Sequence, residues 1–168
     1  IHSGESEFSL IGIPADDYPE LPTVSGGIPF AIKQGILKNM VKQTIFAVAV
    51  QDIKPVHKGI KFEVENNNLR LISCDGFRLA IRNEKVDARD SMQFVVPKRT
   101  LTEVANMLKE DAEEQCVISV SRSHILFEFD GYIVFSRLLE GEFHNYKSSI
   151  PASFETEVLV NTGELTKC

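Results

Sequence analysis

The chain has 168 residues, of which 43% are hydrophobic and 25% are charged, so it can bury a hydrophobic core within one domain of ordinary size. No apolar run approaches the roughly 18–20 residues of a membrane-spanning helix. The first residues lack the basic and apolar start of a secretion signal, so we expect neither a membrane-spanning helix nor a signal peptide. The net charge of −6 does not exclude a nucleic-acid partner, because phosphate contact depends on where the positive side chains lie.

The first half of the chain is predicted to contain a strand, a linker, a helix and three further strands. Residues 8–13 alternate weakly and predict a strand, whereas three prolines make residues 14–22 an extended linker. Apolar residues at helical spacing predict a helix over residues 30–48, with Pro29 in its first turn. A polar loop follows over residues 51–58. Alternating patterns then predict strands over residues 60–65, 69–74 and 77–82, separated by turns at residues 66–68 and 75–76.

The second half of the chain repeats this order of elements. Residues 94–96 predict a short strand that ends at Pro97. Apolar residues at offsets of 0, 3, 4 and 7 from Leu101 predict an amphipathic helix, which begins either at a capping box of Thr100 and Glu103 or nearer Pro97. After an acidic loop, three more strands are predicted over residues 116–120, 125–129 and 132–138.

The order strand–helix–strand–strand–strand therefore occurs twice. The turns Asp75-Gly76 and Asp130-Gly131 mark the same step in the two copies, 55 residues apart. One helix against a run of antiparallel hairpins in each copy predicts an α+β fold with the helices packed on the sheets. Because solenoids normally stack three or more units, two copies favour a single domain with pseudo-twofold symmetry.

Four stretches of the chain carry a likeness to one known family. They are residues 14–19 (PADDYP), 73–80 (SCDGFRLA), 95–99 (VVPKR) and 136–143 (SRLLEGEF), the last running on to Tyr146 and to the Ile-Pro step at residues 150–151. In this order along the whole chain they resemble the bacterial DNA sliding clamp, the beta subunit of DNA polymerase III.

The resemblance implies a DNA-clamp fold and a division of the chain into three parts. Residues 1–22 would be the end of a first clamp domain with its linker, residues 23–150 the complete middle domain, and residues 151–168 the start of a third domain. The first residue is Ile1 rather than methionine, so we expect a piece of a longer protein.

The resemblance also implies a non-catalytic processivity factor for DNA replication without a cofactor. Such a ring segment encircles duplex DNA without reading its sequence and tethers the replicative polymerase, clamp-loader subunits and other partners through their linear peptide motifs. The full-length protein would be a head-to-tail homodimeric ring. This chain alone, which lacks both ring-closing surfaces, is expected to be a monomer. The cytoplasmic location that we expect comes not from the resemblance but from the three cysteines, whose number and spacing favour reduced thiols.

A clamp needs basic side chains that contact phosphates on its DNA side. The candidates are Lys38, Lys42, Lys54, Lys98, Arg99 and Arg137. For the last four, the resemblance itself implies a DNA-facing position. The alternative for each is a solvated surface charge. The clamp interpretation requires that the two helices lie side by side and present their basic residues toward a common surface.

The family's second site is an apolar pocket that accepts a short partner peptide. The positions that the resemblance implies are His57, Cys74, Gly76, Phe77, Arg78, Leu79, His144 and Ser148. Of these, His57, Phe77, His144 and Ser148 depart from the family's best-known pattern. The alternative for Phe77 and Leu79 is core packing of a strand, and the alternative for Arg78 is an outward-facing strand charge.

A rival hypothesis is a stand-alone α+β enzyme or small-ligand domain, in which Asp75 and a histidine would act together. The four histidines have no metal-ligand spacing, and no nucleophile or nucleotide-binding motif is present. The three cysteines are odd in number and far apart, so we expect no metal site and reduced thiols packed as small apolar residues.

We predict that the chain alone binds duplex DNA weakly, because an open ring segment loses topological retention and keeps only a few phosphate contacts. A filter-binding titration at increasing salt measures this, and tight, salt-resistant binding would contradict the clamp interpretation.

Overall fold

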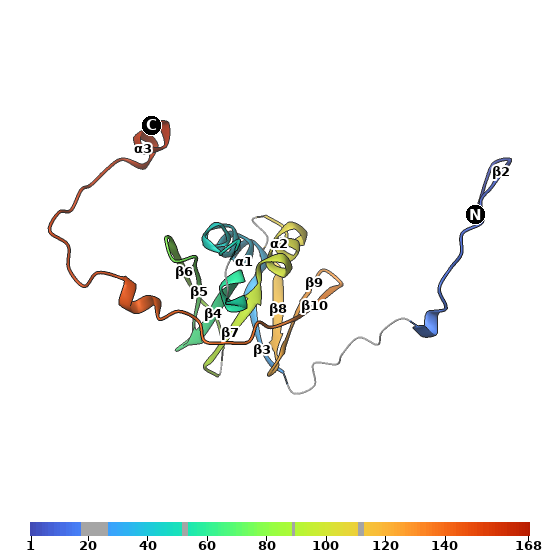
Figure 1. Ribbon diagram of the computed structural model, residues 1–168, viewed down its shortest axis with the longest axis horizontal. Coiled ribbons are helices and arrows are strands. Elements are labelled where there is room, and N and C mark those ends of the chain that lie inside the picture. The colour runs from blue at the N-terminus through green and yellow to red at the C-terminus, as the bar shows by residue number, and fades with distance from the viewer. Residues whose placement is uncertain (18–26, 52–53, 89, 111–112) are drawn as a thin grey trace.

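The computed structural model describes residues 1–17, 27–51, 54–88, 90–110 and 113–168. Residues 27–149 of this described part form a packed unit, and the N-terminal and C-terminal segments extend away from it on opposite sides (Figure 1). Much of the predicted linker and part of the acidic loop, residues 18–26 and 111–112, lie outside the described residues.

The packed unit contains two copies of the same order of elements. The first copy consists of β3 (Ile28–Lys33), α1 (Gln34–Lys42), β4 (Gly59–Glu65), β5 (Asn68–Cys74) and β6 (Leu79–Lys85). The second consists of β7 (Met92–Pro97), α2 (Lys98–Met107), β8 (Gln115–Val120), β9 (His124–Phe129) and β10 (Tyr132–Arg137). Short 3-10 turns are η2 (Ile45–Ala47), η3 (Pro55–Lys58) and η4 (Tyr146–Ser149). The extending segments hold β1 (His2–Ser3), β2 (Ser6–Glu7), η1 (Ala15–Asp17) and α3 (Thr162–Lys167).

The two copies exchange their first strands. The packed unit has two four-stranded antiparallel sheets, with the orders β6-β5-β4-β7 and β10-β9-β8-β3. Strand β3 thus pairs with β8 of the second copy, and β7 pairs with β4 of the first. The two sheet orders correspond strand for strand, which confirms the predicted duplication and the α+β fold.

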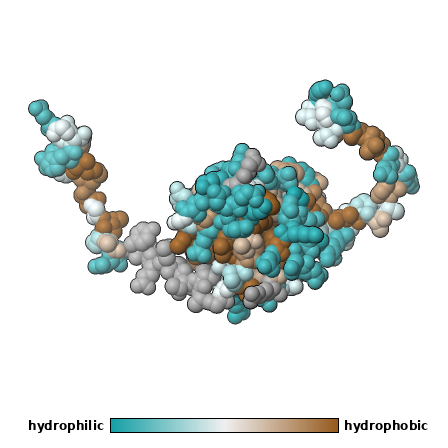
Figure 2. Space-filling view, turned by 180° about the vertical axis from the view of Figure 1, so that it is seen from behind, coloured by the Kyte–Doolittle hydropathy of each residue, from teal (hydrophilic) through white to brown (hydrophobic). Residues whose placement is uncertain are grey.

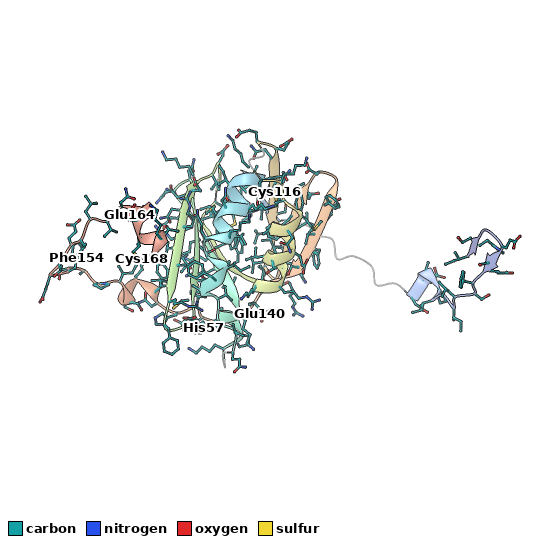
Figure 3. The ribbon with its side chains drawn as sticks, turned by 90° about the horizontal axis from the view of Figure 1, so that it is seen from above. His57, Cys116, Glu140, Phe154, Glu164 and Cys168 are labelled. Carbon is teal, nitrogen blue, oxygen red and sulfur yellow. The ribbon has the colours of Figure 1, made fainter. Side chains whose placement is uncertain are left out.

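Helices α1 and α2 lie side by side on one side of the two sheets (Figures 1 and 3). Each helix buries its apolar stripe, with Leu37, Met40 and Val41 on α1 and Leu101 and Val104 on α2 all at most 1% exposed. The side-by-side placement that the clamp interpretation requires of the two helices is therefore present.

The main core lies between the helices and the inner faces of both sheets. In β4, Phe62 and Val64 point inward and the intervening Glu63 points to the other face, as strand alternation requires. Burial raises the pKa of the Cys116 thiol to about 12, so this cysteine packs as an apolar residue as expected. Cys168 is exposed, and the expectation of packing was wrong for it.

The largest correction concerns the predicted helix over residues 30–48. Residues 28–33 are strand β3, α1 begins only at Gln34, and η2 is a separate turn. The buried residues Phe30 and Ile32 alternate with more exposed neighbours, which is a strand pattern. This pattern was overlooked because the residues that follow it have the apolar spacing of a helix. Pro29 is tolerated because β3 is an edge strand rather than a helix start.

Three smaller predictions also differ from the structure. Residues 8–13 form no strand, because no described strand lies beside them to pair with their backbone. Strand β6 begins at Leu79, so Phe77 and Arg78 belong to the preceding turn. Helix α2 begins at Lys98 after Pro97, and the Thr100 hydroxyl bonds to that of Ser136 (2.7 Å) instead of capping the helix.

No helix among the described residues is long and apolar enough to span a membrane. Polar side chains dominate the face of the packed unit seen in Figure 2, whereas both extending segments carry stretches of exposed apolar side chains. These are Phe8, Leu10, Ile11 and Ile13 on one side and Phe154, Val158, Leu159 and Val160 on the other.

Candidate functional site

A pocket of about 650 Å³ lies between the β5–β6 turn, the turn η3 and the chain that follows β10. It is lined by Lys54, His57, Cys74, Asp75, Gly76, Phe77, Arg78, Leu79, His144 and Ser149. Seven of the eight residues singled out in the sequence for a peptide site are among them. The eighth, Ser148, does not line the pocket, because its hydroxyl turns back to the carbonyl of Asn145 (2.7 Å), and the next serine lines it instead.

The β5–β6 turn is held by Asp75. One carboxylate oxygen accepts hydrogen bonds from the N–H groups of Phe77 (3.0 Å) and Arg78 (2.8 Å), and the other accepts two from the Arg78 guanidinium (3.0 and 2.8 Å). These bonds, those from Arg78 first, lower the pKa of Asp75 to about 2. Gly76 has a φ of +89°, which favours glycine at this position of the turn.

This turn gives the pocket an apolar wall beside a basic rim. The Phe77 side chain is 97% exposed, so the alternative of core packing was wrong for it. Leu79 is half-buried and packs against the cluster that contains Cys74. It also lines the pocket, so both interpretations, pocket lining and core packing, are correct for Leu79. An exposed phenyl ring next to a half-buried leucine provides apolar surface that a ligand can reach in the folded protein.

The opposite wall comes from residues 138–149, which we call the strap. The strap crosses the outer face of the sheet β6-β5-β4-β7 and brings His144 to the pocket, where its ring nitrogen lies 3.0 Å from the Ser149 hydroxyl. Phe143 of the strap meets the His57 ring edge-on, with ring centres 5.8 Å apart. In Figure 3, His57 and Glu140 of the strap are both seen toward the same edge of the packed unit.

Among the basic candidates, Lys98 and Arg99 lie together at the start of α2. With Lys58 of η3 they line a shallow hollow of about 370 Å³, together with Ala49, Val50, Thr102 and the carboxylate of Glu103. Three cations against one carboxylate at a helix N-terminus leave an excess of positive charge that is suited to phosphate.

Lys38 and Lys42 lie at the other end of the helix pair. The Lys38 ammonium donates to the carbonyl of Leu108 (2.7 Å) just after α2, and its side chain is only 13% exposed. Both lysines pair with Glu110, whose pKa they lower, chiefly through the hydrogen bond from Lys42. These two lysines are therefore engaged within the chain, which makes them weaker candidates for DNA.

The remaining two basic candidates are separate from both groups. Lys54 lines the pocket rather than the hollow. Arg137 is exposed at the end of β10, and the bond between Ser136 and Thr100 places this strand end beside the first turns of α2.

A family model described as "DNA polymerase III beta subunit, central domain" matches residues 31–145. The chain belongs to this family.

Individual sliding clamps are similar in sequence to this chain along almost its whole length. The beta sliding clamp of Bacillus subtilis is 36% identical over 98% of this chain, and that of Halalkalibacterium halodurans is 39% identical over 96% of it. The solved Bacillus subtilis clamp superposes with a TM-score of 0.92, and a Pseudomonas aeruginosa clamp bound to griselimycin with a TM-score of 0.82 at 30% identity. This chain covers 44% of the solved Bacillus subtilis clamp and 42% of the solved Pseudomonas aeruginosa clamp. It covers 44% of the Bacillus subtilis sequence and 43% of the Halalkalibacterium halodurans sequence. The chain thus spans less than half the length of each.

Three features of this clamp domain were missed in the sequence. Lys58 follows Lys54 by four positions in the loop after α1, a spacing that carries little signal by itself. The role of Asp75 in holding Arg78 depends on a turn whose strand boundary was misplaced by two residues. The contacts of the strap depend on side chains far apart in the chain, which no local pattern reveals. No group of three or more metal-ligating side chains occurs in the described part.

Proposed function

We propose that this chain is the central segment of a bacterial DNA sliding clamp, a replication processivity factor that encircles duplex DNA and tethers a DNA polymerase. The observation that carries the proposal is the pocket of about 650 Å³ in a domain of this family, formed by the same turn that carries the likeness in sequence. Tethering raises the concentration of an enzyme at its template and needs neither catalysis nor a cofactor.

The division into three parts belongs to this proposal. The exposed apolar side chains of the two extending segments are suited to pack against a first and a third clamp domain on either side. We infer that the intact protein closes head to tail into a homodimeric ring in the cytoplasm, and that clamp-loader subunits are among its partners.

For DNA, the arrangement supports contact through Lys98 and Arg99 at the start of α2 and Lys58 of η3. These three cations line a shallow hollow rather than a deep cleft, and Arg137 at the end of β10 does not line it. Shallow phosphate contacts hold the backbone without reading bases, as a protein that must slide along DNA requires.

For protein partners, the pocket supports capture of a short extended peptide with an apolar side chain. Leucine, cysteine and phenylalanine side chains supply the apolar wall, and Lys54, His57, Arg78 and His144 surround it with basic groups against one carboxylate, that of Asp75. Since a Pseudomonas aeruginosa relative was solved with griselimycin, we propose this compound as a probe of the pocket.

The rival interpretation as an enzyme built on Asp75 loses its physical basis. Both oxygens of Asp75 accept hydrogen bonds, and its pKa of about 2 makes the carboxylate a poor proton acceptor near neutral pH.

We expect Arg78→Ala and Leu79→Ala each to weaken griselimycin binding about tenfold or more, because anchor residues of a pocket dominate its affinity. Isothermal titration calorimetry on the intact clamp that carries this chain measures the change. Arg82→Ala is the matched control, since Arg82 lies on β6, pairs with Glu84 and does not line the pocket. Unchanged affinity in both pocket variants, or an equal loss in the control, would reject the pocket as the binding site.

A further inference from the structure

The strap that forms one wall of the pocket is fastened to the sheet by a small polar cluster. Tyr146 of the strap is only 4% exposed, and its hydroxyl donates to a carboxylate oxygen of Glu63 on β4 (2.8 Å). The Arg70 guanidinium on β5 donates to the same hydroxyl (3.1 Å). Lys61 pairs with the second oxygen of Glu63 (2.7 Å). We call Lys61, Glu63, Arg70 and Tyr146 the latch.

The latch lies on the outer face of the sheet, where its residues alternate with core residues. Glu63 stands between Phe62 and Val64, which are buried in the main core. Its side chain is 12% exposed, so this carboxylate has left most of its water and depends on its partners. That desolvation alone would raise the pKa of Glu63, but the hydrogen bonds from Lys61 and Tyr146, together with the charges of Lys61 and Arg70, keep it below its ordinary value.

Besides the polar bonds of the latch, two backbone bonds at the start of the strap and several buried side chains hold it. The Leu138 N–H donates to the carbonyl of Ser123 (2.8 Å) and the Leu139 N–H to the carbonyl of Val95 (2.9 Å). The Leu138 side chain is buried in the main core. Phe143 and Tyr146 are buried against Val95 and Ile72 in a cluster separate from the main core. The Lys61 ammonium lies 5.8 Å from the Phe143 ring centre and 6.0 Å from that of Tyr146.

The position of the latch along the strap links it to the pocket. His144, which lines the pocket, and the latch residue Tyr146 are joined through a hydrogen bond from the Tyr146 N–H to the His144 carbonyl (2.8 Å). Ser149, the other strap residue of the pocket, ends the 3-10 turn that Tyr146 begins. A strap that lifts at Tyr146 therefore carries one wall of the pocket with it.

We propose that Tyr146, through Glu63 and Arg70, is a positioning residue for the pocket: it holds the strap in the geometry that accepts a ligand, without touching the ligand. The inference rests on the proposed function, because it concerns the same pocket. A site that is open only part of the time binds with an association rate reduced by that fraction, whereas loss of a direct contact raises the dissociation rate.

The test variant is Tyr146→Phe in the intact clamp, which keeps the buried ring and removes the hydroxyl. Loss of a hydrogen bond to a charged group should accelerate hydrogen exchange of the Leu139 and Ser148 amides about tenfold, with the amides of β9 unchanged. Stopped-flow binding of griselimycin should show an association rate slower by about twofold or more, with the dissociation rate unchanged. Glu63→Gln, which keeps an oxygen acceptor for the hydroxyl, should give an intermediate result.

Two controls separate the latch from other effects. Tyr132→Phe removes a hydroxyl from a half-exposed tyrosine on β10 that does not line the pocket, and should change neither rate. His144→Ala removes a pocket-lining side chain and should act mainly on dissociation.

Each outcome decides a different claim. Unchanged strap exchange in Tyr146→Phe would overturn the latch. Faster exchange with an unchanged association rate, or a change in the dissociation rate alone, would overturn its positioning role. If the unaltered clamp does not bind griselimycin, both the positioning role and the pocket assignment are overturned. If it binds tightly, and Arg78→Ala weakens this binding while Tyr146→Phe does not, only the inference about the latch is overturned.

Discussion

Replacing Phe62 by alanine is expected to destabilise the packed unit by about 3–5 kcal/mol, a large part of the roughly 5–15 kcal/mol that stabilises a typical domain. Phe62 is fully buried at the centre of β4, and its ring stacks on that of Phe94 with centroids 5.2 Å apart. Its removal leaves a cavity between the sheet and the helices that the paired strands β4, β5 and β7 cannot collapse to fill. Urea unfolding followed by circular dichroism measures the loss.

Phe77→Ala is the matched control for this prediction. The same side chain is truncated, but Phe77 is 97% exposed on the β5–β6 turn, so a change of no more than about 0.5 kcal/mol is expected. Equal destabilisation by the two substitutions would contradict the placement of β4 in the core and of Phe77 outside it.

The second large effect is expected for Gly59→Ala, at the start of β4. The Gly59 backbone is extended, so alanine is conformationally acceptable there. A methyl group would, however, lie 2.4 Å from the backbone oxygen of Val96 and 2.9 Å from a methyl of Leu139 in the strap. The pairing of β4 with β7 must open or the strap must move, and we expect destabilisation of about 1–3 kcal/mol or more.

Urea unfolding also measures this effect, and hydrogen exchange at the Leu139 amide reports whether the strap moves. Gly12→Ala is the control, because a methyl group added there meets no atom within 4 Å. If Gly59→Ala is as stable as the control, the close approach of strands and strap at this position is wrong.

The sequence predicted the repeated order of elements because several elements after η3 have a clear period of their own. In β4, β8 and β9 buried side chains alternate with more exposed ones, and α2 follows a proline that sets its start. Strand β3 was missed because it runs directly into α1 without a turn, so one apolar pattern passes into another at Gln34. The first strand of the repeat was therefore assigned to residues 8–13, which have no partner strand among the described residues.

For the site, the sequence could indicate the β5–β6 turn but not the environment of each side chain. The likeness to a family indicated seven of the pocket residues, whereas the two hydrogen bonds from the Arg78 guanidinium to one oxygen of Asp75 could be seen only in the folded structure. The engagement of Lys38 with the end of α2 joins residues 70 positions apart, and the contact of Tyr146 with Glu63 joins residues 83 positions apart. Contacts between residues so far apart in the sequence cannot be predicted from local spacing.

The exchange of first strands between the two copies has a consequence for how the polypeptide reaches its native state. Each three-stranded hairpin array remains incomplete until the opposite copy supplies its fourth strand, so neither copy is a self-sufficient folding unit. Pairing of β3 with β8 must wait for almost the whole unit to emerge from the ribosome, since these strands are separated by most of its length. The nascent chain therefore exposes unpaired strand backbone during synthesis, and the unit should fold late and in one cooperative step.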